Sequence, residues 1–149
     1  MSRKHDMWTH ASSVQIENRA WEAQALRRGR WTRVTPSGDD NWGWFHFAIP
    51  TPVMVDNVPL KAQSALIRFS AGPQASIVHF QVWNASEEPA IFDKVVNFTS
   101  TGKPQNFPVP LEYRPELIAG VGISIKVNFT RRDSDAWIEL IGAGIRFSP

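Results

Sequence analysis

The sequence has 149 residues and contains no cysteine. This absence excludes disulfide-stapled scaffolds, cysteine nucleophiles, thiolate zinc sites and cysteine-ligated iron–sulfur clusters. The chain has the usual length of a single domain, and a domain of that size can bury a hydrophobic core without covalent crosslinks. We therefore expect one domain over residues 1–149, with residues 1–12 forming an N-terminal arm.

Long apolar runs are also missing. No stretch approaches the roughly 18 apolar residues of a membrane-spanning helix. The charged residues at the start of the chain are not followed by the apolar segment of a secretory signal. The sequence therefore predicts a protein with no membrane partner, located in the cytoplasm or exported by a route that uses no cleavable signal peptide.

Catalytic and phosphate-binding motifs are absent as well. There is no G-x-S-x-G nucleophile elbow, no H-E-x-x-H zinc motif and no glycine-rich phosphate loop. The acidic turns at Asp39/Asp40 and Asp133/Asp135 could coordinate calcium, or could bond only their own backbone amides. We expect no enzyme activity, no catalytic residue, no cofactor and no metal ligand, and we leave calcium at these turns open.

Helical periodicity is scarce, whereas alternation of apolar and polar residues is common. In residues 121–129 the odd positions are apolar and the even positions are small or polar, as in a half-buried strand. Turn-forming residues separate such segments at spacings near 8–12 residues, which is typical of β-sandwiches and barrels. The pattern predicts an all-β fold, a single-domain antiparallel β-sandwich that is jelly-roll-like and has about 8–10 strands.

The other predicted strands share this alternation less regularly. They span residues 13–17, 20–25, 29–34, 43–49, 60–69, 77–83, 90–98, 105–111 and 136–147. Two prolines in 105–111 predict an edge strand or a strand-like connector, because proline cannot donate to a neighbouring strand. Only residues 114–118 could form a helical turn. In residues 77–83 the alternation assigns Val78, Phe80 and Val82 to one face and Ile77, His79, Gln81 and Trp83 to the other.

Tryptophan is abundant, with seven residues against a single tyrosine. On a strand, Trp42, Trp44 and His46 share one face, and Phe45 and Phe47 share the other. Ile49 lies on the same face as Phe45 and Phe47, and this apolar face is therefore assigned to the core. This leaves two tryptophans and a histidine on the opposite face.

Exposed indole rings beside hydrogen-bonding groups suit the apolar and hydroxyl faces of a sugar, and they also suit a protein interface. Each ring could instead be covered by a loop or a neighbouring strand, because tryptophan is usually mostly buried. If their strands share a sheet, His46 and His79 could approach each other, but scattered structural histidines are favoured over a metal pair. The predicted ligand-binding residues are Trp42, Trp44, His46, His79, Gln81 and Trp83.

The net charge of +2 is unevenly distributed, since residues 1–35 contain seven Lys or Arg and only three acidic residues. Arg27, Arg28 and Arg30 form a basic cluster that could contact phosphate, an anionic surface or an acidic patch on a neighbouring copy. The favoured interpretation is a solvated turn between two strands. No nucleic-acid-binding motif accompanies the cluster, so nucleic acid is not expected as a partner.

Three segments together resemble a family of small bacterial proteins of unknown function. They are residues 8–17 with the pattern W-x-H-x-x-S-V-Q-x-E, residues 44–53 with W-F-H-F-A-I-P-T-P, and residues 60–64. Residues 82–83 and 120–124 also resemble that family's pattern. The resemblance covers most of the chain from Trp8 onward. It implies a compact β-sandwich but neither an activity nor binding residues.

These observations favour a non-catalytic binding module, most concretely one that binds a glycan through the Trp/His face. The alternative is a self-assembling structural or interaction protein that forms homo-oligomers. In that case the basic N-terminal region would dock on a neighbouring copy, with Arg27, Arg28 and Arg30 as the predicted interface residues. The two functions can coexist. An enzyme with a cupin-like metal site would need more clustered histidines than His46 and His79.

Overall fold

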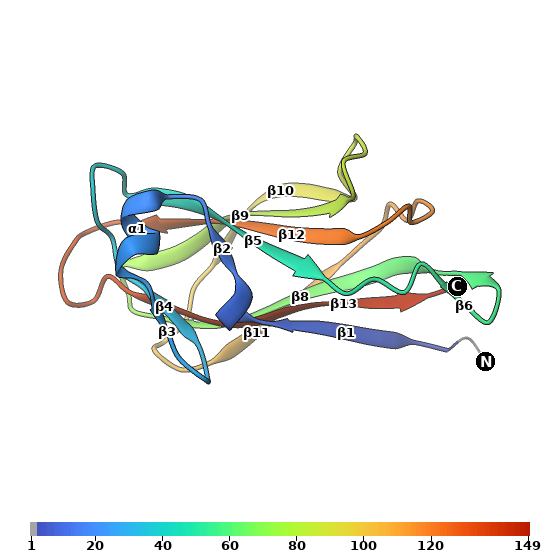
Figure 1. The fold of residues 1–149 in the computed structure, drawn as a ribbon. Coiled ribbons are helices and arrows are strands. Elements are labelled where there is room, and N and C mark those ends of the chain that lie inside the picture. The colour runs from blue at the N-terminus through green and yellow to red at the C-terminus, as the bar shows by residue number, and fades with distance from the viewer. Residues whose placement is uncertain (1–2) are drawn as a thin grey trace.

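A computed structural model of the protein, which describes residues 3–149, contains two antiparallel sheets packed as layers (Figure 1). Sheet A has the order β11 (Gln105–Pro110), β8 (Lys61–Ala71), β13 (Ile138–Ser148), β4 (Thr32–Val34) and β3 (Leu26–Arg27), and β1 (His5–His10) also pairs with β13. Sheet B has the order β10 (Phe92–Phe98), β9 (Ala75–Asn84), β12 (Val121–Phe129), β5 (Trp42–Ile49) and β2 (Gln15–Ile16). The predicted all-β antiparallel sandwich is confirmed.

The described residues contain thirteen strands, including the small hairpin of β6 (Met54–Val55) and β7 (Val58–Pro59). The strands β2, β3, β6 and β7 have only two residues each, which leaves nine longer strands, within the predicted range. No helix within residues 3–149 is long and apolar enough to cross a membrane. The edge position predicted for the proline-containing strand is confirmed by β11, which ends sheet A beside β8.

The core lies between the inner faces of the two sheets. Each long strand sends every second side chain inward, so Phe45 and Phe47 of β5 are buried together with Ile123 and Ile125 of β12. Sheet A contributes Phe69, among others, from the other side. This burial leaves the alternate residues of β5 and β12 on the outer face of sheet B.

Residues Arg19–Gln24 form the helix α1, whereas the sequence pattern wrongly predicted a strand over 20–25. The side-chain oxygen of Asn18 caps this helix by accepting a hydrogen bond from the backbone N–H of Trp21 at 3.2 Å. Trp21 is fully buried, and Gly43 leaves room for it, since a Cβ at that position would lie 2.9 Å from Trp21 Cζ3. A helix of six residues is too short to produce a visible helical periodicity. The turn expected at residues 114–118 is not helical, and a 3₁₀ turn at Ala11–Ser13 lies elsewhere.

A β-bulge in β9 corrects the predicted faces of that strand. Lys126 of β12 pairs with His79, but Val127 pairs with Ile77, so Val78 has no partner position on β12. Ile77 is therefore fully buried and does not face outward, while Val78 is only half-buried. The faces predicted for residues 79–83 are unaffected by the bulge.

The N-terminal segment is part of the sandwich. Residues 1–12 were predicted to be an arm, and residues 1–2 of it lie outside the described residues. The rest contains β1, which pairs with β13 along its whole length from His5 opposite Phe147 to His10 opposite Gly142. The segment His5–His10 is therefore an integral strand of sheet A.

Candidate functional site

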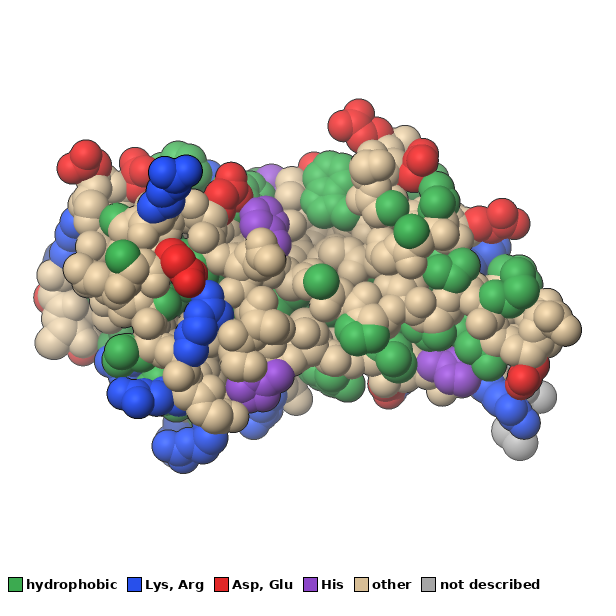
Figure 2. All heavy atoms as spheres, viewed as in Figure 1, with side chains coloured by type: hydrophobic (Ala, Val, Ile, Leu, Met, Phe, Trp, Pro, Cys, Tyr) green, Lys and Arg blue, Asp and Glu red, His purple; other side chains and the backbone are tan. Residues whose placement is uncertain are grey.

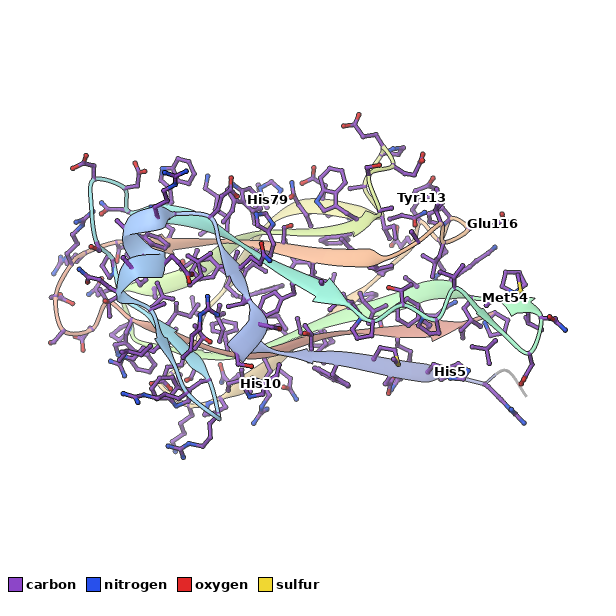
Figure 3. The ribbon with its side chains drawn as sticks, in the orientation of Figure 1. His5, His10, Met54, His79, Tyr113 and Glu116 are labelled. Carbon is purple, nitrogen blue, oxygen red and sulfur yellow. The ribbon has the colours of Figure 1, made fainter. Side chains whose placement is uncertain are left out.

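The outer face of sheet B carries every residue that the sequence predicted to bind a ligand. Trp42, Trp44 and His46 come from β5, and His79, Gln81 and Trp83 come from β9, with β12 between the two strands. Figure 3 places His79 on the outer side of this layer. We call these residues, together with Glu17, Asp93, Ser124 and Lys126 that contact them, the sheet B face.

The strand register arranges the sheet B face in cross-strand rows. Trp44 lies opposite Lys126, which in turn lies opposite His79. In the next row His46 lies opposite Ser124, and Ser124 lies opposite Gln81. Residues that are far apart in the sequence thus become neighbours because β5 and β9 both pair with β12. The two histidines fall in neighbouring rows, on strands that are separated by β12.

The tryptophans of β5 make different contacts. The indole of Trp44 packs against the imidazole of His79 with 5.3 Å between ring centroids and 53° between ring planes. Trp42 remains 46% exposed, and Lys126 Nζ lies 4.6 Å from its ring centroid. The Trp44 ring is therefore held in place by His79. The Trp42 ring is about half exposed and carries the Lys126 ammonium group over it.

His46 is fixed by hydrogen bonds on both ring nitrogens. Its Nδ1 lies 2.7 Å from Ser124 Oγ, and its Nε2 lies 2.7 Å from Glu17 Oε2. The His46 side chain is still 45% exposed. The imidazole therefore has a set orientation and remains accessible from solvent.

A second chain of hydrogen bonds joins β9 to β10. Trp83 Nε1–H donates to Gln81 Oε1 at 3.1 Å, and Gln81 Nε2 donates to Asp93 Oδ1 at 3.3 Å. His79 Nε2 also bonds the same carboxylate oxygen. The indole, amide, carboxylate and imidazole groups thus hold one another in fixed positions on an exposed surface.

Hollows adjoin both ends of the sheet B face. A cavity of about 510 Å³ lies beside Trp83 and is also lined by Asp93 and by Tyr113, the single tyrosine of the chain, which Figure 3 labels near the end of the sandwich. A second hollow of about 390 Å³ is lined by both Trp42 and Trp44. The candidate site is therefore an elongated surface with aromatic side chains at each end.

Sequence reasoning missed several members of this surface. Ser124 and Lys126 occupy polar positions of the clearest alternating segment, so a pairing of that strand with β5 would have identified them. Nothing in the sequence indicated that Asp93 and Tyr113 belong to this surface. Asp93 reaches it through the pairing of the edge strand β10, and Tyr113 through the path of the chain after β11. Glu17 reaches His46 only because β2 pairs with β5.

The predicted interface arginines lie at the β3–β4 hairpin, where Figure 2 shows Lys and Arg side chains gathered at the lower left. Arg27 is engaged within its own chain, since it donates to both carboxylate oxygens of Glu22 at 2.8 and 3.1 Å and to the Ser12 carbonyl at 3.0 Å. Arg28 and Arg30 are exposed at the turn between the strands. The exposure of Arg28 and Arg30 agrees with the expected solvated turn between two strands. A contact of these arginines with a neighbouring copy stays a prediction.

The acidic turns make local bonds. Asp133 accepts a hydrogen bond from the backbone N–H of Asp135 at 2.9 Å, and Arg132 donates to the Asp40 carbonyl at 3.0 Å. Among residues 3–149, no group of three or more His, Asp or Glu side chains is arranged to hold a metal ion. Asp133 thus bonds the backbone of its own turn, and Arg132 contacts the backbone of the Asp40 turn.

Solved structures with a similar fold include carbohydrate-binding modules. A low-affinity xylan-binding module, CBM86, from Roseburia intestinalis has a TM-score of 0.56 and 8% identity, with 95% of this chain and 94% of that chain covered. The CBM1 module of BiXyn10A in its apo form has a TM-score of 0.52 and 11% identity, with 95% and 96% covered. At these identities the similarity concerns the fold.

A family two carbohydrate esterase from Cellvibrio japonicus is similar at a TM-score of 0.50 and 9% identity, over 98% of this chain, but this chain spans only 34% of the esterase. The comparison with curated proteins finds no match. One family of sequences does match, and it does so over residues 1–149. The chain belongs to this family, DUF6623, a family of unknown function, as the resemblance of its tryptophan-containing segments implied.

Proposed function

We propose that this protein is a non-catalytic module that binds a glycan on the sheet B face. One observation carries the proposal: an open strand face holds indole rings and hydrogen-bonding groups that are fixed by each other. Trp44 is held by His79, and His79 is held by Asp93. The same carboxylate also holds Gln81, which accepts from Trp83.

The chemistry of a pyranose ring matches this arrangement. The axial C–H groups of a sugar form an apolar face that stacks on an indole, while the equatorial hydroxyls project sideways toward donors and acceptors. Trp42 supplies an open ring, and Gln81, Asp93 and His46 supply groups beside the rings. Because the face is ordered before a ligand arrives, little side-chain entropy is lost on binding.

The length of the face favours a polysaccharide chain over a single sugar. Aromatic residues stand at both ends, with Trp83 and Tyr113 beside one hollow and Trp42 and Trp44 beside the other. The cross-strand row at the Trp83 end contains Gly122, which lies opposite both Trp83 and Ala48, so small side chains leave the face low beside Trp83. The xylan-binding neighbour supports the proposal only in showing that this kind of sandwich is compatible with glycan binding.

The carboxylates of the face serve as hydrogen-bond partners in this proposal. Glu17 is engaged by His46, and Asp93 is engaged by His79 and Gln81. Each therefore orients a neighbouring side chain, which is a positioning role and involves no bond cleavage in the ligand.

Native affinity electrophoresis tests the proposal with gels that contain arabinoxylan, mixed-linkage β-glucan, glucomannan or xyloglucan. We expect the wild-type protein to be retarded in at least one gel. Trp44→Ala should weaken that retardation by about tenfold or more, because it removes both a stacking ring and the packing of His79. Trp31→Ala is the matched control, since Trp31 lies at the distant β3–β4 hairpin. Circular dichroism verifies that both variants are folded.

Two results would contradict the proposal. One is the absence of retardation of the wild-type protein in all the gels. The other is equal retardation of Trp44→Ala and wild type. Light scattering on the same samples tests the homo-oligomer alternative, because an oligomer that dissociates in Trp44→Ala would make this face a contact between copies.

A further inference from the structure

A second exposed indole lies on the opposite side of the molecule. Trp8 of β1 is 51% exposed and shares the outer face of sheet A with Asp6 and His10. Figure 3 places His10 on the lower side of the sandwich and His79 on the upper side. The two indole-bearing faces therefore point away from each other.

Trp8 rests directly on the backbone of sheet A. It lies opposite Gly144 of β13, and a Cβ added at Gly144 would lie only 2.7 Å from Trp8 Cδ2 and 2.8 Å from Trp8 Cε3. The ring thus covers a position where any side chain would collide with it. One side of the indole packs on the strand, and about half of the residue stays open to solvent.

Polar groups flank this ring in a cleft of about 160 Å³. Leu66 and Pro108 line the cleft beside Trp8, and Ser64 lies opposite Arg146 in the neighbouring row. Arg146 donates from Nε and Nη2 to the two carboxylate oxygens of Asp6 at 2.7 and 2.8 Å. Its Nη1 makes no hydrogen bond within residues 3–149, so this nitrogen can donate to a ligand.

We propose that this cleft, which we call the Trp8 site, binds one pyranose ring of a neutral glycan. The ring would stack on the open side of the indole, with its hydroxyls directed to Arg146, Asp6 and Ser64. A neutral ligand is favoured because the charges of Asp6 and Arg146 cancel. A single ring is favoured because the cleft is smaller than the roughly 300–1,000 Å³ of sites for drug-sized ligands.

The Trp8 site is argued from its own geometry and does not depend on the sheet B face. A consequence follows only if the proposed function also holds. With binding sites on opposite faces, one molecule could hold two polysaccharide chains and crosslink them.

Isothermal titration with xylohexaose and with cellohexaose tests the Trp8 site. With the hexaose that binds, we expect about two molecules per wild-type chain, about one for Trp8→Ala, about one for Trp44→Ala and none for the double variant. Arg146→Lys keeps the positive charge but loses the paired donors, and it should weaken only the site that Trp8→Ala removes. A mixture with the corresponding polysaccharide should become turbid with wild type and stay clear with either tryptophan variant.

The outcomes separate the two proposals. Unchanged stoichiometry and affinity in Trp8→Ala would overturn the Trp8 site and leave the sheet B face standing. Loss of a site in Trp8→Ala with no effect of Trp44→Ala would support the Trp8 site and overturn the sheet B face as a glycan site. No binding of either hexaose by wild type would overturn the Trp8 site as a glycan site. A wild-type dimer that becomes a monomer in Trp8→Ala would assign this face to a second copy of the chain and would also overturn it.

Discussion

The indole of Trp44 packs against the imidazole of His79 at 5.3 Å between ring centroids, although a whole strand, β12, separates their own strands. Lys126 of β12 lies between them, because it pairs with Trp44 on one side and with His79 on the other. His79 is held in turn by Asp93 of the edge strand β10. The position of Trp44 therefore depends on a carboxylate that is three strands away.

This dependence predicts an effect of Asp93→Ala on binding. The variant releases both His79 and Gln81, so the affinity for the polysaccharide that retards wild type should fall by about three- to tenfold. Asp93 is about half exposed, so the melting temperature should change little. Glu87→Ala, at an exposed turn, is the control. Equal affinities of the Asp93 and Glu87 variants would show that the hydrogen bonds do not position the binding groups.

The tryptophans should differ in their contribution to stability. Trp21 is fully buried, stacks edge-on against Phe129 at 5.1 Å and donates from Nε1 to the Ser37 carbonyl at 3.0 Å. Trp21→Ala should lower the free energy of unfolding by about 3–5 kcal/mol, because it leaves a cavity and an unpaired carbonyl. Trp42→Ala should lower it by less than about 1 kcal/mol, since Trp42 is exposed. Urea denaturation measures both, and similar losses would contradict the assignment of Trp42 to the surface.

The contact of Trp8 with Gly144 predicts a coupled pair of substitutions. Gly144→Ala should destabilise the protein by about 1–3 kcal/mol, because the new methyl group collides with the indole and lies 3.0 Å from the Met7 carbonyl oxygen. Combining it with Trp8→Ala should recover part of this loss, because only the backbone contact remains. A double-mutant cycle from denaturation midpoints measures the coupling. Additive effects would mean that the ring does not rest on Gly144.

The Asp6–Arg146 pair predicts a small dependence of stability on acid. The hydrogen bonds from Arg146, and then its positive charge, hold the pKa of the Asp6 carboxyl below its usual range. A lowered pKa means that the pair stabilises the folded state above the unfolded pKa, near 3.9, and that this stabilisation is lost as the pH falls through the folded value. Asp6→Asn should therefore melt slightly below wild type at pH 7 and together with it near pH 2. Both side chains are about half exposed, so the difference should be small and should shrink further in high salt. A difference that is larger at pH 2 than at pH 7 would contradict this role.

The strand pattern predicted much of the fold and most of the candidate site, for a physical reason. In a sandwich with one buried face, alternation is enforced by the core, so the positions of Phe45 and Phe47 also determine where Trp44 and His46 must point. The same logic identified His79, Gln81 and Trp83 on β9. Their proximity to Trp44 depends on strand order, which alternation within a single strand does not encode.

The errors have local causes. The bulge at Val78 changes the phase within β9, and nothing in an alternating run signals an extra residue. The helix α1 has only six residues, of which Trp21 is the buried one, so it resembles a short strand in the sequence. Trp8 had no assignable face, because its exposure depends on the pairing of β1 with β13 and on the glycine beneath its ring.

The central claim, that the sheet B face binds a glycan, is tested most directly by the indole N–H signals of the seven tryptophans in a ¹H–¹⁵N NMR titration. Xylohexaose and cellohexaose are added in separate titrations, with signals assigned by single Trp→Phe variants. We predict that the signals of Trp42, Trp44 and Trp83 shift in at least one titration, while those of Trp21 and Trp31 stay in place. If both hexaoses leave Trp42, Trp44 and Trp83 unshifted, or move only tryptophans outside the sheet B face, the claim is contradicted.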